Sequence, residues 1–264
     1  MTGVTILLAS RDRLPLLVQS VSSALEQTHA DLEVLVVDDG SGAETRRWLE
    51  RRALESGRLR VVHQDAAGVG AARARGVREA SRELVTILDS DDRLAPDAVS
   101  RIAAEFERDP ELDLVYTNHY HLLPDGSVRA TRYPAYLDNG RMIRGVLLRP
   151  RVPFKHSGTT FRRDVAIALG NYDAELGIKI DIEFLLRFLR AGRRQLLLPG
   201  DPAVFFRSHS ESLSRQRLRG IRAWCRIIDR HGPPGRTART FAKAVRAGWE
   251  LAKWGYASVY WRGP

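Results

Sequence analysis

Short apolar runs alternate with amphipathic stretches along the first 110 residues. The apolar runs are rich in Val, Leu and Ile, which favours β-strands, and the stretches between them show helical periodicity. Strands that are almost wholly apolar and are separated by helices predict an α/β fold, with a mostly parallel central sheet flanked by helices. The expected strands are 4–9, 33–37, 59–63 and 84–88, and the expected helices are 14–25, 43–55, 70–80 and 96–107.

The pattern changes beyond residue 110. Residues 112–120 predict a strand, and Pro124-Asp125-Gly126-Ser127 predicts the turn of a hairpin across 122–132. Antiparallel additions of this kind are common in mixed sheets. The remaining expected elements are a helix at 181–190, strands at 195–198 and 203–207, a break at Pro233-Pro234-Gly235 and a basic amphipathic helix at 237–260.

Composition narrows the class of protein. With 264 residues, 44% of them hydrophobic, the chain can bury a sizeable core. Cys225 is the single cysteine, so neither an intramolecular disulfide nor a thiolate metal site is expected, and we expect a reducing, cytoplasmic setting. No basic segment precedes the first apolar run, which predicts a strand and not a signal peptide, and no run reaches the roughly 18 residues that span a bilayer.

A net charge of +10 calls for an anionic partner, which could be nucleic acid, anionic lipid or a phosphorylated substrate. An ordinary solvated surface explains the charge equally well.

Two acidic clusters follow predicted strands. Asp38-Asp39-Gly40-Ser41 follows the second strand, and Asp89-Ser90-Asp91-Asp92 follows the fourth. Ligands of open α/β sheets bind beyond the carboxyl ends of the strands. A turn that caps the next helix explains the first cluster as well as a ligand does, but three carboxylates in four residues exceed what a cap needs. Because such carboxylates repel one another and suit Mg²⁺ or Mn²⁺, the second cluster predicts a divalent-cation site.

A glycine-rich stretch spans residues 68–76. It fails the dinucleotide-binding fingerprint, because Arg73 stands where a glycine is required and the stretch does not follow the first strand. No Lys-Ser/Thr follows to make a phosphate-binding P-loop. Two interpretations remain: a loop that leads into an alanine-rich helix, or a loop whose Arg73 reaches a nucleotide.

Six segments in this order resemble the family-2 glycosyltransferases, which have a GT-A fold, and the resemblance covers most of the first 210 residues. It implies a GT-A catalytic domain at 1–210, with a Rossmann-like nucleotide-sugar-binding half at 1–110 and a mixed acceptor and catalytic half at 111–210. Residues 211–264 then form a basic, aromatic, helical C-terminal extension. The segments are Val4-Thr5-Ile6-Leu7-Leu8-Ala9-Ser10-Arg11, Val36-Val37-Asp38-Asp39-Gly40-Ser41, Gly70-Ala71-Ala72-Arg73 with Gly76, Leu88-Asp89-Ser90-Asp91-Asp92, Asp181-Ile182-Glu183-Phe184-Leu185-Leu186-Arg187 and Phe206-Arg207-Ser208-His209-Ser210.

The resemblance implies a donor pocket formed by the first three segments. Ser10 and Arg11 would line the nucleotide pocket. Asp39, with Asp38 beside it, would accept a hydrogen bond from the base, expected to be the N3–H of uracil. Arg73 would lie near the base or the phosphates.

The resemblance also implies the metal ligands. Asp89 would lie near the ribose, with Ser90 as a further contact to the nucleotide-sugar. Asp91, with Asp92, would bind the Mn²⁺ or Mg²⁺ ion that bridges the diphosphate. His209 would contact the metal or the diphosphate from a late loop.

Asp181 matches the position of the family's catalytic base, which takes the acceptor's proton in an inverting transfer. A helix cap is the alternative role and is compatible with the first. Glu183 is a weaker candidate, because it can pair with Arg187 at i, i+4 on the helix surface. The sequence departs from the family pattern at Ile180, where an acid is usual, at Ala74, where an Asn is usual, and at 9–12, which replace Pro-Thr-Tyr-Asn.

The expected function is metal-dependent, inverting transfer of a sugar from a nucleotide-sugar to an acceptor hydroxyl, in cell-surface polysaccharide or glycolipid synthesis. UDP is the expected nucleotide, ahead of dTDP and GDP. A sugar nucleotidyltransferase is the first alternative, although it should carry an N-terminal glycine-rich phosphate loop. A non-catalytic nucleotide-sugar-binding protein is the second. A nucleic-acid-binding protein is the third, but the sequence has no zinc spacing or aromatic RNA-binding signature, so no nucleic acid partner is expected.

Basic and aromatic residues alternate in the C-terminal segment, which suits a helix lying on an anionic membrane. The alternative is a helix that packs its tryptophans on the catalytic domain. Membrane contact would indicate a lipid-linked or cell-surface saccharide acceptor and a peripheral position at the inner face of the membrane. The residues concerned are Arg236, Arg239, Lys243, Arg246 and Lys253, with Phe241, Trp249, Trp254, Tyr256, Tyr260 and Trp261.

Overall fold

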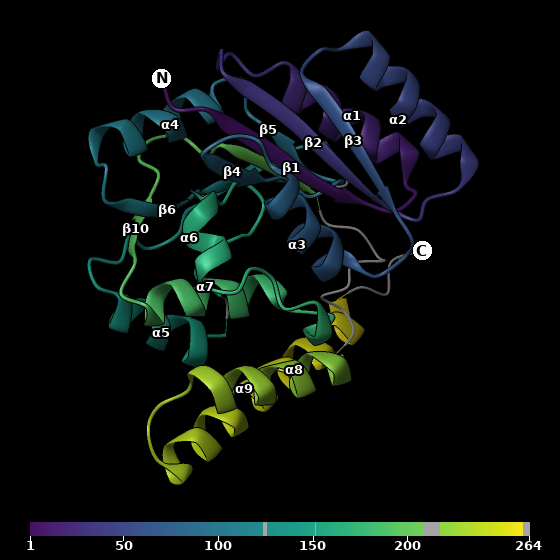
Figure 1. Ribbon diagram of the computed structural model, residues 1–264. Coiled ribbons are helices and arrows are strands. Elements are labelled where there is room, and N and C mark those ends of the chain that lie inside the picture. Colours follow the sequence, from purple (N-terminus) through teal and green to yellow (C-terminus); the bar gives the residue numbers. More distant parts are fainter. Residues whose placement is uncertain (124–125, 151, 208–216, 261–264) are drawn as a thin grey trace.

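The computed structural model describes residues 1–123, 126–150, 152–207 and 217–260; at 217 and 253–260 it describes only the backbone. Two sheets and the helices around them make up this part of the chain (Figure 1). The strands are β1 Val4–Ser10, β2 Leu32–Asp39, β3 Leu59–Gln64, β4 Leu84–Ile87, β5 Arg93–Leu94, β6 Leu112–Tyr116, β7 His119–Leu122, β8 Val128–Thr131, β9 Thr160–Arg162, β10 Arg194–Leu197 and β11 Val204–Arg207. The helices are α1 Leu14–Leu25, α2 Ala43–Glu55, α3 Val69–Glu79, α4 Ala98–Arg108, α5 Asn139–Leu148, α6 Arg163–Ala168, the 3₁₀ turn η1 Ala174–Leu176, α7 Ile180–Arg190, α8 Arg217–His231 and α9 Arg236–Tyr260.

The large sheet has seven strands in the order β10-β6-β9-β4-β1-β2-β3. Its half formed by β4, β1, β2 and β3 is parallel, as the sequence predicts. β2 is buried along its whole length, because helices cover both faces of the sheet. Gly76 brings α3 close to the sheet: a Cβ atom at this position would lie 2.2 Å from Cδ1 of Leu7. The first half therefore packs as a compact unit whose strand ends share one edge.

The second half of the large sheet is mixed. β9 lies between β4 and β6 and runs antiparallel to both, whereas β10 is parallel to β6. Between residues 133 and 180 the sequence pattern predicted no element, whereas α5, β9, α6 and η1 lie there. The pattern there is too short and irregular for periodicity to show.

The single strand expected at 112–120 is wrong, because the chain leaves the large sheet at Thr117 and Asn118. β6 stays in the large sheet, and β7 enters a small sheet of order β5-β11-β7-β8. Asn118 is buried at this crossing, where its Oδ1 accepts a hydrogen bond from the Tyr133 N–H at 2.7 Å and its carbonyl accepts one from the Ala203 N–H. β7 and β8 pair antiparallel, as expected of the hairpin, although residues 124 and 125 of its turn lie outside the described residues.

Helices α8 and α9 lie side by side below α5 and α7 in the view of Figure 1. Their shared core includes Trp224, Ile227 and Ala242, which are all buried. The helical extension is thus present, and α8 adds a helix that the sequence analysis did not place. The expected boundary at residue 210 falls among residues that are not described. Among the described helices, none combines the length and the apolar character that crossing a membrane requires.

Candidate active site

The carboxyl ends of β1, β2 and β4 lie next to one another at one edge of the large sheet. Ser10 is the register partner of Asp38, and β4 flanks β1 on its other side. The residues that follow these strands are thereby brought together, as the parallel pattern predicts. This edge carries Ser10, Asp38, Asp39 and the acidic loop at 89–92.

Asp38 is fully buried and fixes the loop that follows β2. Its Oδ1 accepts a hydrogen bond from the Ser41 N–H at 3.0 Å, and its Oδ2 lies 2.8 Å from Nδ1 of His63 and 3.2 Å from Nε of Arg46. Burial opposes the ionised form, but the hydrogen bonds from Ser41 and His63 outweigh it and hold the pKa of Asp38 below its usual value. Asp38 is therefore a carboxylate that stabilises the loop from within.

Asp39 is buried as well and binds the loop that leads into α3. Its Oδ1 accepts hydrogen bonds from Gln64 Nε2 and from the Ala67 N–H, and its Oδ2 accepts one from the Gly68 N–H, each at 2.8 Å. A carboxylate has about four acceptor positions, so Asp39 keeps capacity for one further donor. Gly68 has φ of +91°, a conformation that favours glycine, where the chain turns towards Asp39.

The loop after β1 is connected to the loop after β2. Ser10 is buried and Arg11 is exposed at its start. The Asp12 N–H donates to Oγ of Ser41, and Oδ1 of Asp12 accepts from the Gly42 N–H, both at 2.8 Å. Asp12 itself has a φ of +55°, a backbone conformation that residues with a side chain rarely adopt. These contacts fix the end of β1 beside the carboxylates of β2.

Asp89, Asp91 and Asp92 form the acidic loop, and each offers a carboxylate oxygen within 4.8 Å of the others. Asp92 is fully buried; its Oδ1 accepts the Arg207 N–H at 3.0 Å, and its Oδ2 has no hydrogen-bond partner among the described residues. Burial and the charges of Asp89 and Asp91 raise the pKa of Asp92 well above its usual value. Ser90, in the middle of the loop, is partly exposed.

The acidic loop fits a hard divalent cation. Three carboxylates converge, and one buried oxygen of Asp92 lacks a partner among the described residues, which is costly unless a cation or a proton offsets it. A carboxylate oxygen of Asp89 lies in this cluster with those of Asp91 and Asp92, although Asp89 was expected near the ribose. His209, the other expected ligand, lies outside the described residues.

Three cations surround the acidic loop. Arg13 pairs with Asp91 at 3.5 Å, and Arg73 pairs with Asp89 through Nη2. Lys155 lies with its Nζ 3.3 Å from the ring centroid of Phe206. Burial lowers the pKa of Lys155. The negative charges of four carboxylates act against this shift, so the Lys155 ammonium interacts electrostatically with all four: Asp92, Asp89, Asp181 and Asp91. Lys155 was not predicted as a site residue, because nothing in its local sequence marks it.

Asp181 lies in the first turn of α7, two residues after the N-cap Lys179. Its charge acts on Arg73, Lys155 and Tyr172, so it shares the neighbourhood of the acidic loop although the two are 92 residues apart in the sequence. Ile180, which stands where the family usually has an acid, is buried in the core. Asp181 thus lies near Arg73, Lys155 and Tyr172, and its role as the base stays a prediction.

Tyr172 and His156 form a buried polar pair next to Asp181 and Arg73. The Tyr172 hydroxyl lies 2.7 Å from Nε2 of His156, and its ring stacks on Phe184 of α7 with centroids 4.3 Å apart. Burial raises the pKa of Tyr172 and lowers that of His156, so both are uncharged at neutral pH. Neither was expected from the sequence, because both lie in the stretch without predicted elements.

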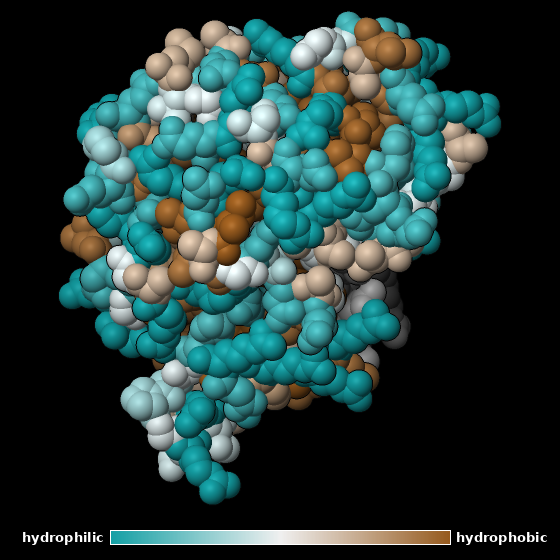
Figure 2. Space-filling model, viewed as in Figure 1, coloured by the Kyte–Doolittle hydropathy of each residue, from teal (hydrophilic) through white to brown (hydrophobic). Residues whose placement is uncertain are grey.

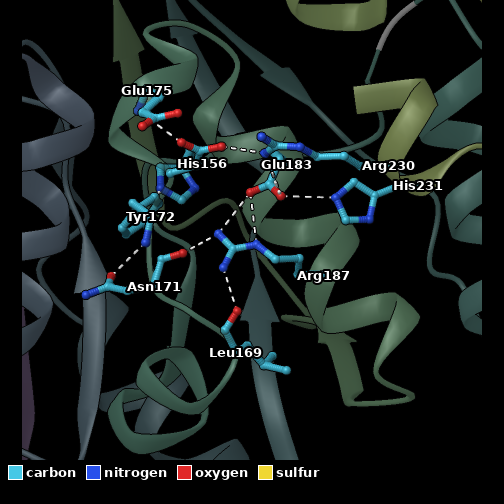
Figure 3. Close-up of polar contacts among 10 residues, drawn as sticks. His156, Leu169, Asn171, Tyr172, Glu175, Glu183, Arg187, Arg230 and His231 are labelled. Atoms are coloured by element: carbon cyan, nitrogen blue, oxygen red, sulfur yellow. Dashed lines mark hydrogen bonds and ion pairs between the residues drawn. The ribbon is translucent and has the colours of Figure 1, made fainter. Parts of the chain in front are cut away.

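Glu183 has a structural role in the protein interior, which differs from the ion pair on the helix surface that was expected. It does bind Arg187, with Nε at 2.9 Å from Oε2, but it is buried, and Oε1 lies 3.0 Å from Nε2 of His231 (Figure 3). Arg230 lies 3.9 Å from the same oxygen. Burial opposes ionisation, but His231 and Arg187 outweigh it and hold the pKa of Glu183 below its usual value. The expectation of a surface pair is therefore wrong: Glu183 joins α7 to α8.

Comparison with known proteins identifies the family. Residues 5–170, more than half of the chain, match the model of glycosyl transferase family 2. The chain belongs to this family. It is therefore a glycosyltransferase, and the predicted enzyme class is confirmed.

Curated relatives of this glycosyltransferase match it over less than half of its length. A chondroitin synthase of Escherichia coli is 38% identical over 117 residues, which cover 44% of this chain and 17% of that protein. A hyaluronan synthase of Pasteurella multocida is 38% identical over 113 residues, 43% of this chain and 12% of that protein. The chain therefore spans less than a fifth of the length of these relatives.

Solved structures share the fold over almost the whole chain. TarS 1–349 of S. aureus, in complex with UDP-GlcNAc, has a TM-score of 0.71 at 16% identity and covers 98% of this chain and 76% of its own. The mannosyltransferase PcManGT of Pyrobaculum calidifontis, in complex with GDP-Man and Mn²⁺, has a TM-score of 0.68 at 19% identity and covers 100% of this chain and 77% of its own. The predicted GT-A fold is confirmed.

Proposed function

We propose that this glycosyltransferase is metal-dependent and inverting, and moves a sugar from a nucleotide-sugar, with UDP as the first candidate nucleotide, to an acceptor hydroxyl. The observation that carries the proposal is the convergence of the acidic loop and Asp181 around Arg73 and Lys155. Carboxylates for a cation and a separate carboxylate for a proton are the two groups that such a transfer needs. The complexes of TarS with UDP-GlcNAc and of PcManGT with GDP-Man and Mn²⁺ support the class of donor.

The donor would bind at the strand ends of the 1–110 half. Ser10, Arg11 and Asp39 would contact the nucleoside, with Asp39 using its remaining acceptor position for the base. Asp38 is fully buried, and its contacts to Ser41 and His63 would give it the role of holding that wall of the pocket. The donor's phosphates would bind between this wall and the acidic loop.

A divalent cation, Mn²⁺ or Mg²⁺, would be held by Asp91 and Asp92, with Asp89 within reach and His209 as a further candidate. Such a cation offsets the charge that develops on the departing diphosphate. Arg73 adds a fixed positive charge beside Asp89, and Ser90 would contact the donor from the same loop.

Asp181 would act as the base. The acceptor oxygen forms a bond to the anomeric carbon, the bond from that carbon to the diphosphate oxygen breaks, and the acceptor's proton passes to a carboxylate oxygen of Asp181. The acceptor would bind against the 111–210 half, on the same side as Asp181.

The proposed acceptor is a saccharide or a lipid-linked saccharide of the cell surface. This proposal rests on the basic and aromatic residues of the C-terminal helices. Phe241 of α9 is 64% exposed, which suits contact with a membrane surface. Two other members of the predicted basic and aromatic set contact the rest of the protein: Arg246 is buried, and Trp249, which is 37% exposed, donates a hydrogen bond to the Leu148 carbonyl of α5 at 3.1 Å. Figure 2 shows a largely hydrophilic face with separate, smaller hydrophobic areas. Co-sedimentation of the protein with vesicles that contain anionic lipid, compared with Phe241→Ser, tests this contact.

A thermal-shift screen tests the proposed donor and metal. UDP, GDP, dTDP, CDP and their sugars are each added with and without Mn²⁺, because a ligand that binds the native state raises its Tm. We expect a shift that needs Mn²⁺ and is confined to one nucleotide family, followed by turnover of the corresponding nucleotide-sugar. No shift with any nucleotide in a folded sample would contradict the proposal. A shift without turnover on any acceptor would favour a nucleotide-sugar-binding protein.

A further inference from the structure

Lys179 is held in an unusual conformation directly before the first turn of α7. Its φ is +58° and its ψ is +24°, the left-handed region, which residues with a side chain rarely adopt. As the N-cap it accepts hydrogen bonds from the Ile182 and Glu183 N–H groups, both at 3.1 Å. The backbone at Lys179 therefore sets the direction in which Asp181, two residues further on, leaves the helix.

The C-terminal helices hold the side chain of Lys179. Its Nζ lies 3.2 Å from Oε1 of Glu250 on α9 and 5.3 Å from the ring of Trp224 on α8. The indole N–H of Trp224 donates to the same Glu250 oxygen at 3.2 Å. Trp224 and Glu250 are buried, so this ion pair is shielded from water and is stronger than a surface pair.

Arg246 fixes the helices around this contact. Its guanidinium stacks over the Trp224 ring at 3.8 Å, and its Nε donates to the Leu147 carbonyl at the end of α5 at 2.8 Å. Gly220 of α8 allows the close approach, because a Cβ there would lie 3.3 Å from Cε of Lys179. Each partner of Lys179 is thus itself fixed by packing.

Further contacts from α8 hold the same segment before and after Asp181. Arg230 of α8 binds Asp173, which also caps η1 by accepting the Glu175 N–H at 2.9 Å. His231 binds Glu183 in the same region, as Figure 3 shows. The C-terminal helices thus contact residues 173, 179 and 183 and leave Asp181 between these contacts.

We propose that Glu250 and Lys179 are positioning residues for Asp181, so that α8 and α9 complete the active site instead of only extending the fold. This inference rests on the proposed role of Asp181 as the base. The charged side chain of Glu250, from a distant part of the chain, binds Lys179, whose backbone has a strained conformation that local sequence alone would not maintain. A base displaced by about 1 Å loses much of its catalytic effect, whereas the donor site lies on other elements.

Glu250→Gln tests the proposal, because it removes the charge that pairs with Lys179 and keeps the shape and an acceptor for the Trp224 indole. We expect kcat to fall about 10- to 100-fold, with the donor KM and the Mn²⁺-dependent thermal shift unchanged. We also expect faster hydrogen exchange at the Ile182 and Glu183 amides, which lose a fixed N-cap. The double variant Lys179→Gln/Glu250→Gln should lose no more than the worse single variant, because both act through one contact.

Asp229→Asn is the matched control. Asp229 of α8 pairs with Lys243 of α9 at 2.6 Å, so the control removes an ion pair within the same two helices without touching α7. Its kcat should match that of the wild type. If Glu250→Gln does not fold, Lys179→Gln replaces it, because this side chain reaches the protein surface and keeps 16% exposure.

Two results would overturn the proposal. Wild-type kcat in folded Glu250→Gln would show that the contact does not position the base. Equal losses in Glu250→Gln and Asp229→Asn, with Tm falling in parallel, would show general destabilisation. Failure of the proposed function gives a different result, since the wild type itself would then not turn over any nucleotide-sugar.

Discussion

The two carboxylate groups of the candidate site are supported in different ways. On the donor side, Asp39 is bound by the Ala67 and Gly68 backbone amides and by the Gln64 side chain. On the side of Asp181, Glu183 binds His231 and Glu250 binds Lys179, and in each pair the two side chains come from elements that are distant in the sequence. Backbone donors close to the strands keep their place as long as the sheet is folded, whereas long side chains depend on charge and on the packing of another helix.

This difference separates what fixes the donor from what fixes the base. The donor loops rest on a close-packed parallel sheet, so we expect them to respond to changes in packing. The base rests on buried ion pairs between helices, so we expect it to respond to changes in charge and pH. The predictions below follow from this separation, from the largest expected effect to the smallest.

Asp181→Asn should separate transfer from binding most strongly. Removing a general base lowers the rate about 10²- to 10⁴-fold, whereas donor binding should not change, because the donor contacts lie on other elements. Transfer is measured by nucleoside diphosphate release and binding by calorimetry with Mn²⁺. Asp164→Asn, at an exposed carboxylate on α6, is the control and should match the wild type. Normal transfer by Asp181→Asn would remove this residue as the base.

Gly76→Ala should damage the donor side by packing alone. The added Cβ would lie 2.2 Å from a methyl of the buried Leu7, so we expect a net loss of about 1–2 kcal/mol in the free energy of unfolding, measured by urea denaturation. Gly248→Ala in α9 is the control, because its Cβ meets no atom within 4 Å. It should stabilise the helix by about 0.5–1 kcal/mol. Equal effects at the two glycines would contradict the close contact between α3 and β1.

Glu183→Gln should make stability less dependent on pH. The pKa of Glu183 is lowered in the folded protein, so its ionised form contributes stability above the unfolded pKa, and that contribution is lost as pH falls through the folded pKa. We expect a loss of about 1–2 kcal/mol near neutral pH that shrinks as the pH falls below the unfolded glutamate pKa of about 4.3. Urea denaturation across this range measures it. Glu55→Gln, at an exposed surface pair, should cost less than about 0.5 kcal/mol at any pH, and an equal loss there would refute the structural role of Glu183.

Lys155→Met should have the smallest effect. It should strengthen the binding of Mn²⁺, whereas the preceding variants lose activity or stability. The ammonium of Lys155 lies in the field of the acidic loop, so its removal should tighten binding of Mn²⁺ alone about 10-fold. Calorimetric titration with Mn²⁺ in the absence of nucleotide measures this change. Lys243→Met, in α9, leaves the acidic loop untouched and should bind Mn²⁺ like the wild type. Unchanged affinity in Lys155→Met would place its charge outside the metal site.

The sequence predicted the first half of the fold because its information is local. β1 to β4 are apolar runs with helices between them, and β2, β3 and β4 each pair with a strand that precedes them in the sequence. The second half depends on contacts that no local pattern contains. β9 has three residues and is inserted between β4 and β6, and the chain leaves the large sheet after β6, where the Asn118 side chain accepts a hydrogen bond from the Tyr133 N–H.

The candidate site likewise has one part that the sequence predicts and another that it does not. Asp38, Asp39 and the acidic loop could be located because strand ends of a parallel sheet share an edge, and Asp181 because it follows a family pattern. Lys155, His156 and Tyr172 were not found, because their burial near Asp181 results from the path of the chain between β8 and α7. The contact between Glu250 and Lys179 spans 71 residues and two helices, and neither residue carries a local signal.

Calorimetric titration of the wild type and of Asp91→Ala with UDP and with GDP, each with and without Mn²⁺, tests the central claim most directly. The account predicts that the wild type binds one of these nucleotides only when Mn²⁺ is present. It predicts no metal-dependent binding to folded Asp91→Ala, because the carboxylate that would hold the cation is gone. Equal, metal-independent binding to both proteins would contradict the assignment of the acidic loop as the metal site.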